Sequence, residues 1–388
     1  MSKSLAISIL ALSLIRAAVA PAFPAAADTP FGALPSVSSF APRELEQAPS
    51  LSVCRRFARI GSRSDAEKGV SAAAGKAAGK GYVISARNAV SVATEETLRE
   101  SVEFLTDPIA GGRATGSMGS TMAGWWIARR MEHAGLVPAG DSFYHGFKAS
   151  NGAKGMNIMG ILPGKGSSGK QYIIVAAHYD HLGELGGSLY PGADSNASGV
   201  AAMLTVADMF RKMNSLGREY HKSILFVALD AKTLNLGGAV RLLNELRSGT
   251  VTDPSTGKAI TPDDIEMMVN IDQVGSTLSP LHPGNKDYIM MLSEGPGGRR
   301  DNLLAVNRKE RLGMDISFSY YGSRDFTNLF YRRVSDQKPF LEAGITSVMF
   351  TSGITMLNNK PGDSVETLDF PVFRKRVILI FHWLSGIL

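Results

Sequence analysis

One apolar run in this chain leads directly into a group of polar residues. Tyr172-Ile173-Ile174-Val175 continues through two alanines to His178 and Asp180. A continuous apolar run rich in β-branched residues is typical of a parallel strand that is buried on both faces. Such a strand would carry His178 at its carboxyl end, where open α/β sheets place their sites.

Similar runs alternate with stretches of helical character. We expect further strands at residues 223–229, 267–271, 288–292 and 346–350, and helices beginning near Thr94 and at about 121–133, 196–213 and 371–384. Strands that alternate with helices predict an α/β fold with a doubly wound, mostly parallel central sheet flanked by helices.

The amino-terminal residues have the layout of a signal peptide. Lys3 precedes an apolar run over residues 5–15, and small residues lead to an A-x-A-like exit at Ala27. We therefore expect residues 1–27 to be a signal peptide and the protein to be exported to the periplasm or the extracellular space. Residues 28–90 include an Ala/Gly/Lys tract and are predicted to form a low-complexity leader. The folded domain is then expected at 91–388.

Charge and cysteine content narrow the classes of function. The formal net charge of +6 comes from scattered basic residues that do not interleave with aromatic ones, so a nucleic-acid partner is not expected. No apolar run is long enough to predict a membrane span. The single cysteine, Cys54, excludes an internal disulfide and a cysteine-based zinc site.

The polar residues after the first strand form two recognisable segments. His178 and Asp180 lie two residues apart, so they point the same way in an extended chain, and a carboxylate there can fix which imidazole nitrogen is free. A glycine-rich segment, G-A-D-S-N-A-S-G, follows at 192–199. Together they resemble the hallmarks H-x-D and G-A-D-(D/S)-N-x-S-G of the M28 zinc aminopeptidases. The segment G-G-R-A-T-G at 111–116 adds to the resemblance.

This resemblance implies a metal site. M28 enzymes hold two zinc ions that share an aspartate, and a nearby glutamate is the general base. Carried over by motif, His178 is the first histidine, Asp194 is the shared aspartate, and Asp272 in N-I-D-Q-V-G is a third ligand. Asp180 would not bind the metal itself but would orient the His178 ring through the imidazole nitrogen that faces away from the metal. We expect these ligands to converge, and the Asp194–Ser195 peptide bond to be cis.

The residues for the second metal and for the base are replaced. Where the family has a pair of glutamates, this chain has Lys232 and Thr233, and where it has a second histidine, this chain has Gln337. The surrounding segments D-A-K-T-L-N-L-G and S-D-Q-K-P-F are otherwise retained. An ammonium cannot act as a carboxylate base at neutral pH unless its pKa is strongly lowered. Two placements of Lys232 stay open: beside the aspartates as a substitute for the missing cation, or in solvent.

These features favour an exported M28-like protein with impaired or lost aminopeptidase activity. It would retain at most one zinc ion and bind the amino terminus of a peptide or protein. The alternative is an active zinc aminopeptidase with an unusual site that recruits Asp180, His181 or Asp230. Glutaminyl cyclisation occurs on the same fold with one zinc ion, but that zinc uses the glutamate and the second histidine, which are replaced here.

Overall fold

The computed structural model describes residues 86–166, 171–278, 284–294 and 298–388. The expected signal peptide at 1–27 and residues 28–85 of the expected leader lie outside the described residues. Residues Ile84–Leu388 form one compact unit. Its first described elements are a 3₁₀ helix, η4 (Ala86–Val92), and helix α3 (Glu95–Thr106), whose N-cap Thr94 accepts a hydrogen bond from the Thr97 amide.

A mixed nine-stranded sheet in the described residues forms the centre of the unit, in the order β1-β3-β7-β4-β10-β13-β11-β12, with β2 also paired to β3. The four central strands are parallel, and antiparallel pairing begins on both sides of them, at β3 and at β11. The expected α/β sheet flanked by helices is therefore confirmed, although parallel pairing is confined to the centre and to β11–β12. The strands are β1 (Val137–Pro138), β2 (Tyr144–Lys148), β3 (Lys154–Leu162), β4 (Tyr172–His178), β7 (Ser223–Leu229), β10 (Ile265–Ile271), β11 (Tyr288–Ser293), β12 (Asp315–Ser317) and β13 (Ser347–Thr351).

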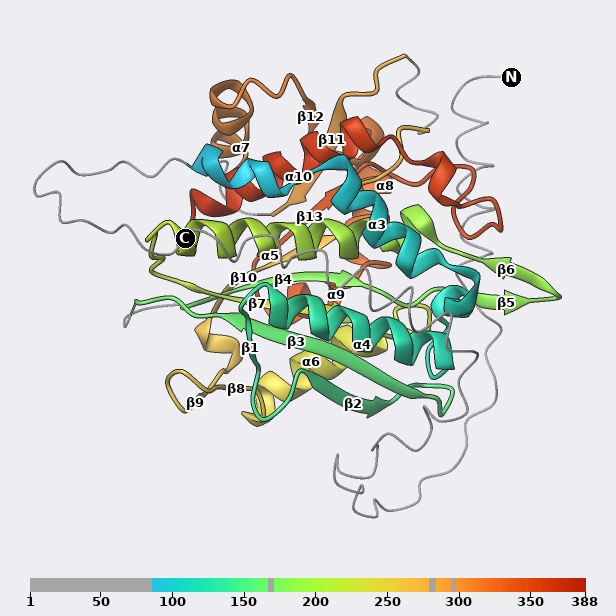
Figure 1. The fold of residues 1–388 in the computed structure, drawn as a ribbon, viewed down its shortest axis with the longest axis horizontal. Coiled ribbons are helices and arrows are strands. Elements are labelled where there is room, and N and C mark those ends of the chain that lie inside the picture. Colours follow the sequence, from blue (N-terminus) through green and yellow to red (C-terminus); the bar gives the residue numbers. More distant parts are fainter. Residues whose placement is uncertain (1–85, 167–170, 279–283, 295–297) are drawn as a thin grey trace, which may run out of the picture. The chain divides into compact units, whose positions relative to one another are not determined.

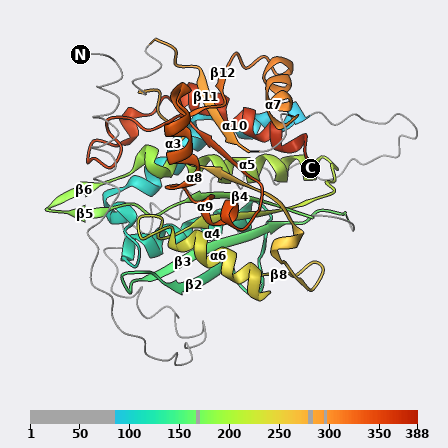
Figure 2. The ribbon, with the colours of Figure 1, turned by 180° about the vertical axis from the view of Figure 1, so that it is seen from behind.

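Helices cover both faces of this sheet. The face toward the viewer in Figure 1 carries α3, α4 (Met118–His133), α5 (Gly199–Ser215) and α10 (Phe370–Ser385). The opposite face, seen in Figure 2, carries α6 (Gly237–Ser248), α8 (Arg324–Arg332) and α9 (Lys338–Glu342). Helix α7 (Gly298–Lys309) lies beside the end of α10, where the Trp383 indole donates to the Arg299 carbonyl.

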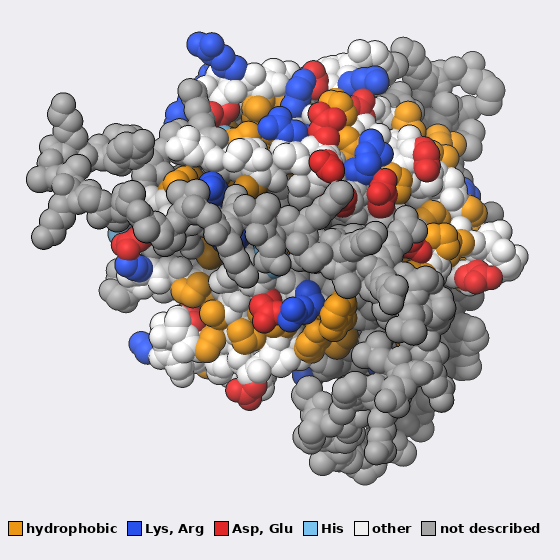
Figure 3. Space-filling view, viewed as in Figure 1, with side chains coloured by type: hydrophobic (Ala, Val, Ile, Leu, Met, Phe, Trp, Pro, Cys, Tyr) orange, Lys and Arg blue, Asp and Glu red, His pale blue; other side chains and the backbone are white. Residues whose placement is uncertain are grey.

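Two small hairpins and five short helical segments complete the described part of the unit. The hairpins are β5 (Gly183–Leu185) with β6 (Ser188–Tyr190) and β8 (Thr252–Asp253) with β9 (Lys258–Ala259). The helical segments are the 3₁₀ turns η5 (Pro108–Arg113), η7 (Pro262–Asp264), η8 (Tyr320–Gly322) and η9 (Val365–Thr367) and the π-helical η6 (Ala193–Ser198). None of the described helices combines the length and apolar character that crossing a membrane requires. On the face drawn in Figure 3, basic and acidic side chains of the described residues are interspersed rather than separated by sign.

Helix α5 is buried around its whole circumference over its first three turns. Every residue from Gly199 to Phe210 is buried. The reason is its position between the sheet and the outer helices: Phe210 packs against Phe381 of α10 with ring centroids 5.0 Å apart. Its one acidic residue, Asp208, is paired with Arg130 of α4 at 2.8 Å.

The Arg130–Asp208 pair makes stability depend on pH. Burial alone raises the pKa of Asp208, but His133 and Arg130 outweigh it and the pKa is lowered. A lowered carboxyl pKa stabilises the fold above the unfolded value of about 4, and this contribution is lost as pH falls through the folded pKa. Asp208→Asn should therefore cost about 2 kcal/mol of unfolding free energy at pH 7 and much less at pH 3.

Chemical denaturation at the two pH values measures this difference. Asp301→Asn on the exposed side of α7 is the matched control and should change neither value appreciably. A cost for Asp208→Asn that is equal at pH 3 and pH 7 would contradict the ion-pair interpretation.

Candidate active site

Three neighbouring parallel strands end at the same edge of the sheet and deliver polar residues there. His178 is the last residue of β4, Asp230 follows β7, and Asp272 follows β10. Strand β4 lies between the other two, with His178 opposite Leu229 and Ala176 opposite Asn270. Lys232 reaches the same place from the turn after β7, and Asp336 from the loop between α8 and α9.

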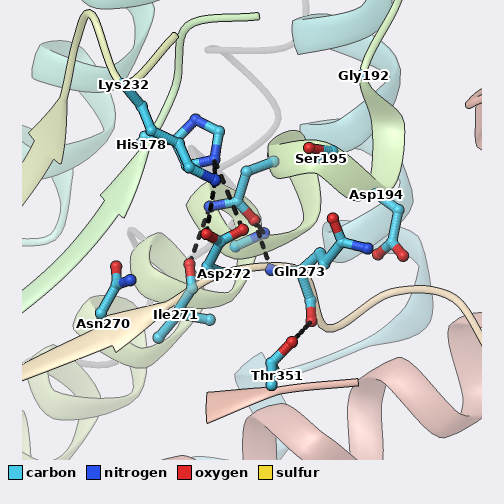
Figure 4. Close-up of polar contacts among 12 residues, drawn as sticks. His178, Gly192, Asp194, Ser195, Lys232, Asn270, Ile271, Asp272, Gln273 and Thr351 are labelled. Atoms are coloured by element: carbon cyan, nitrogen blue, oxygen red, sulfur yellow. Dashed lines mark hydrogen bonds and ion pairs between the residues drawn. The ribbon is translucent and has the colours of Figure 1, made fainter. Parts of the chain in front are cut away.

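Lys232 lies inside this group and not in solvent. Its ammonium nitrogen Nζ is 2.7 Å from Asp272 Oδ2 and 3.0 Å from His178 Nε2 (Figure 4). Its side chain is 20% exposed, whereas that of Asp272 is 6% exposed. Burial lowers the pKa of Lys232, but the charges of Asp272 and Asp336 outweigh this effect and raise it. Lys232 is therefore a cation at neutral pH, and of the two placements that the sequence leaves open, the structure has the one beside the aspartates.

The geometry around His178 assigns its ring protons. Nδ1 is 3.1 Å from the Asp180 main-chain carbonyl oxygen, which can only accept a hydrogen bond, so Nδ1 carries the proton and donates it into this bond. Nε2 is then left to accept a hydrogen bond from Lys232. Burial and Lys232 lower the pKa of His178, while Asp180 and Asp272 raise it, to about 9. Only one proton fits between Nζ and Nε2 at 3.0 Å, however, so the contact itself favours a neutral ring beside a charged lysine.

Asp180 holds the turn that carries Lys232. Its carboxylate accepts hydrogen bonds from the Lys232 amide (2.9 Å), the Thr233 amide (3.1 Å) and the Thr233 hydroxyl (2.8 Å). Burial raises the pKa of Asp180, but these bonds and His178 lower it overall. The expected support of the ring therefore comes from the Asp180 main chain, while its side chain fixes the turn at Lys232.

A further acid, Asp336, lies beside His178 and Asp272. His178, Asp272 and Asp336 form the group in the described residues that could hold a metal ion, with ligand atoms within 4.8 Å of one another. Asp336 is fully buried, and neither carboxyl oxygen has a hydrogen-bond partner. Its burial raises the pKa of Asp336 to about 6, against the opposing effect of His178 and Lys232.

A metal ion does not fit beside Lys232 as it lies here. Zinc binds nitrogen and oxygen ligands at about 2.0–2.2 Å. The one acceptor nitrogen of His178, Nε2, faces Lys232 Nζ at 3.0 Å, and Asp272 Oδ2 is 2.7 Å from the same Nζ. An ion bound by Nε2 along this direction would overlap Nζ. The residues offer ligands of the right chemical type, but the position is taken by an ammonium.

Asp194 does not join this group, which corrects the expected ligand set. Its Oδ1 accepts hydrogen bonds from the Gly275 amide (2.8 Å) and the Ser276 amide (3.1 Å), and from the Ser198 hydroxyl (3.1 Å). In Figure 4 its carboxylate points away from the contact between His178, Lys232 and Asp272. The expected cis bond is likewise displaced: it joins Ser195 to Asn196, and the Asp194–Ser195 bond is not cis.

The other two replaced positions are occupied by structural contacts. Thr233 is bound to Asp180 as described. Gln337 is fully buried, accepts from the Asn270 side-chain amide at 2.8 Å and donates to the Tyr331 carbonyl at 2.7 Å. Neither side chain is available as a ligand.

A buried arginine ties the segments around the site together. Arg113 donates to the carbonyls of Tyr179 (2.7 Å), Pro191 (2.8 Å) and Gly192 (3.0 Å), and to that of Leu105. It therefore joins the end of β4 to the loop that precedes α5. This gives the G-G-R segment of the sequence a physical role.

Two functional positions are not found by sequence reasoning alone. Asp336 lies in the segment S-D-Q-K-P-F, to which the sequence assigns no ligand other than the replaced histidine position. Asp363 accepts hydrogen bonds from the amides of Asp194 (2.8 Å) and Ser195 (3.0 Å), which are 169 and 168 residues away in the chain. The only sequence signal for Asp336 is its place in S-D-Q-K-P-F. For Asp363 we find none.

A double-mutant cycle tests the central ion pair. Lys232→Met keeps an unbranched side chain that lacks the terminal ammonium, and Asp272→Asn keeps the shape without the anion. Each single change strands a buried charge, so the two should be strongly coupled, by about 2 kcal/mol or more in unfolding free energy. Urea unfolding of the four proteins measures this value, and a coupling below about 0.5 kcal/mol would place Lys232 in solvent.

Comparison with known proteins agrees with this architecture. Residues 157–382 match the family model of peptidase family M28. Aminopeptidase YwaD of Bacillus subtilis is 27% identical over 228 residues, covering 56% of this chain and 42% of that protein. The human BOS complex subunit NCLN is 30% identical over 127 residues, covering 32% and 21%. The chain thus spans less than half the length of these curated relatives.

A solved structure of BSAP, a zinc aminopeptidase from Bacillus subtilis, superposes with a TM-score of 0.53 at 15% identity, over 76% of this chain and 95% of that one. The match to the family model, by contrast, is a match of sequence. It covers more than half of the chain, from within β3 to within α10, and contains every residue of the cluster around Lys232. This chain therefore belongs to peptidase family M28 and has the α/β fold of its zinc aminopeptidases.

Proposed function

We propose that this chain is an M28 family member without aminopeptidase activity, and that it binds the free amino terminus of a peptide. The observation that carries the proposal is the position of Lys232, with Nζ 2.7 Å from Asp272 and 3.0 Å from His178. The residue that resembles the family's general base in sequence position is thus a cation bound to the site's own acids.

Hydrolysis of a peptide bond needs a group that takes a proton from the attacking water. A protonated lysine has three donors and no acceptor, so Lys232 cannot do this. The residues named as substitutes are already engaged. Asp180 accepts three hydrogen bonds from the Lys232 turn, and Asp230 accepts from the Thr115 hydroxyl and the amides of Met156 and Ala231.

His181 is also a poor substitute. It is 2% exposed, and burial together with Arg113 lowers its pKa to about 3, so it is a neutral ring without access to bulk water. The expected cofactor, at most one zinc ion, would need the place that Lys232 occupies. The site therefore supports neither a base nor a metal-activated water.

Asp336 supports the binding of an amino terminus. Its two carboxyl oxygens are buried without a hydrogen-bond partner, and a carboxyl group with a pKa of about 6 is ionised at pH 7.5. A peptide ammonium would supply the missing donors. The Lys232 side chain beside the buried acids is partly exposed, so the cluster borders on solvent at that residue. One relative is named as an aminopeptidase and another as a complex subunit, so both peptide and protein ligands are in keeping with the family.

Residues 1–27 support a further part of the proposal, export to the periplasm or the extracellular space. Their basic start, apolar run and small-residue exit have the layout of a signal peptide. Amino-terminal sequencing of the secreted form after expression of the full chain would test it, with a mature start at Asp28 expected.

We expect the purified protein not to release nitroaniline from leucine 4-nitroanilide, with or without added zinc, because Lys232 replaces the general base and its ammonium contacts the atoms that would bind the metal. The His178→Ala variant is assayed in parallel. Equal rates for the variant and the unaltered protein would show that the activity comes from a contaminating peptidase. A zinc-dependent rate that the chelator abolishes and that His178→Ala removes would make the protein an active enzyme, as in the alternative above.

Peptide binding is measured by fluorescence anisotropy with a labelled peptide that has a free amino terminus, and with its N-acetylated form. Loss of one charge-assisted contact costs about 1.5–3 kcal/mol, which corresponds to about 10- to 100-fold in affinity. Acetylation should weaken binding to this extent, and Asp336→Asn should remove the difference between the two peptides. Asp325→Asn, an exposed acid on α8, is the control. Equal binding of both peptides to the unaltered protein would contradict recognition of an amino terminus.

A further inference from the structure

Lys232 lies against a group of three buried ligand side chains: its ammonium contacts His178 and Asp272, and Asp336 is the third member of the group. We propose that its ammonium is a built-in cation that takes the place of a metal ion, and that removing this ammonium opens a divalent-metal site formed by His178, Asp272 and Asp336. The inference rests on the proposed loss of the metal-dependent chemistry, but it concerns what the site binds and not whether it acts on peptides.

The distances among the groups suit a metal once the lysine is gone. Two zinc ligands at tetrahedral positions lie about 3.4 Å apart when each is about 2.1 Å from the ion. His178 Nε2 and Asp272 Oδ1 are 3.6 Å apart, and a carboxyl oxygen of Asp336 lies within 4.8 Å of one ligand atom of each of these two residues. One imidazole and two carboxylates, completed by water, form a donor set that zinc accepts.

Asp336 supplies an independent observation. Both of its oxygens are buried and unpartnered, whereas Asp272 is satisfied by Lys232. A single ammonium has formed contacts with two of the three groups and has left the third without one. A divalent ion would carry twice the charge and could bind all three groups. The unpartnered carboxyl group of Asp336 is therefore the ligand that a metal ion would bind and that the lysine does not contact.

The main chain at this position does not depend on the lysine side chain. Asp180 binds the amides of Lys232 and Thr233 through separate oxygens, at 2.9 Å and 3.1 Å. Truncating the side chain at Lys232 therefore leaves the turn held and opens space next to the ligands. Lys232→Ala is for this reason the most direct variant, and Lys232→Arg is the matched variant that keeps a cation in place.

The experiment measures bound zinc by mass spectrometry after equilibration with zinc chloride and gel filtration, together with the melting temperature with and without zinc. Lys232→Ala should retain one equivalent of zinc and melt at a higher temperature in its presence. The unaltered protein and Lys232→Arg should retain none and show no such rise. Adding His178→Ala to Lys232→Ala should abolish the binding.

Several results would overturn the proposal. One is an equivalent of zinc on the unaltered protein that His178→Ala removes, because the metal and the lysine would then coexist. A folded Lys232→Ala that binds no zinc, or a Lys232→Ala that does not fold at any zinc concentration, would show that the three groups do not form a site. A Lys232→Ala that folds only with zinc supports it. None of these readouts uses peptide hydrolysis or peptide binding, so failure here is distinct from failure of the proposed function.

Discussion

The buried ion pair between Lys232 and Asp272 is the interaction on which the rest of the site depends. An α/β sheet of this type brings the carboxyl ends of adjacent parallel strands together, and here those ends carry acids. Acids collected in a buried place are unstable without a counter-charge, because both desolvation and mutual repulsion oppose ionisation. The family's usual solution is a metal ion, and this chain supplies a side chain of its own.

Much of the fold follows from local patterns. The runs at 172–178 and 223–229 became β4 and β7 because continuous β-branched stretches have few other places in a globular protein. Strand β3 was not expected, since Asn157 and two glycines interrupt its apolar pattern. The structure explains all three: Gly155 makes room for the Phe147 ring, Gly160 for Phe143, and Asn157 accepts from the Asp230 amide and donates to the Gly238 carbonyl.

The site was predictable only in part, because sequence spacing indicates the direction of a side chain on a strand but not on an irregular turn. Sequence order correctly brings His178 and Asp272 together, because both stand at the ends of neighbouring strands. Asp194 lies in an irregular turn, where neighbouring residues point in unrelated directions and spacing says nothing about orientation. The place of Lys232 was equally open, because a four-carbon side chain on a turn can reach either inward or outward. Asp336 depends on how two helices pack, which no local pattern encodes.

The architecture around the cluster is held by contacts that need no metal. Arg113 binds carbonyls from three segments, Asp363 fixes the amides of Asp194 and Ser195, and Asp180 fixes the turn at Lys232. These bonds hold the loops around the cluster in place without the help of a metal ion. The contacts within the cluster therefore need only to balance the charges of its buried acids.

Lys232 is attached to the site at two points, and this limits which residues can replace it. Its amide is bound by Asp180 and its ammonium by Asp272, so the residue is anchored in a pocket of acids. A glutamate at this position would put another carboxylate next to Asp272 and Asp336, on a turn that Asp180 holds in place. Such a chain would need a cation from solution to balance its buried acids. The residue at position 232 therefore decides whether the buried cluster is balanced by the chain itself or depends on an ion from outside.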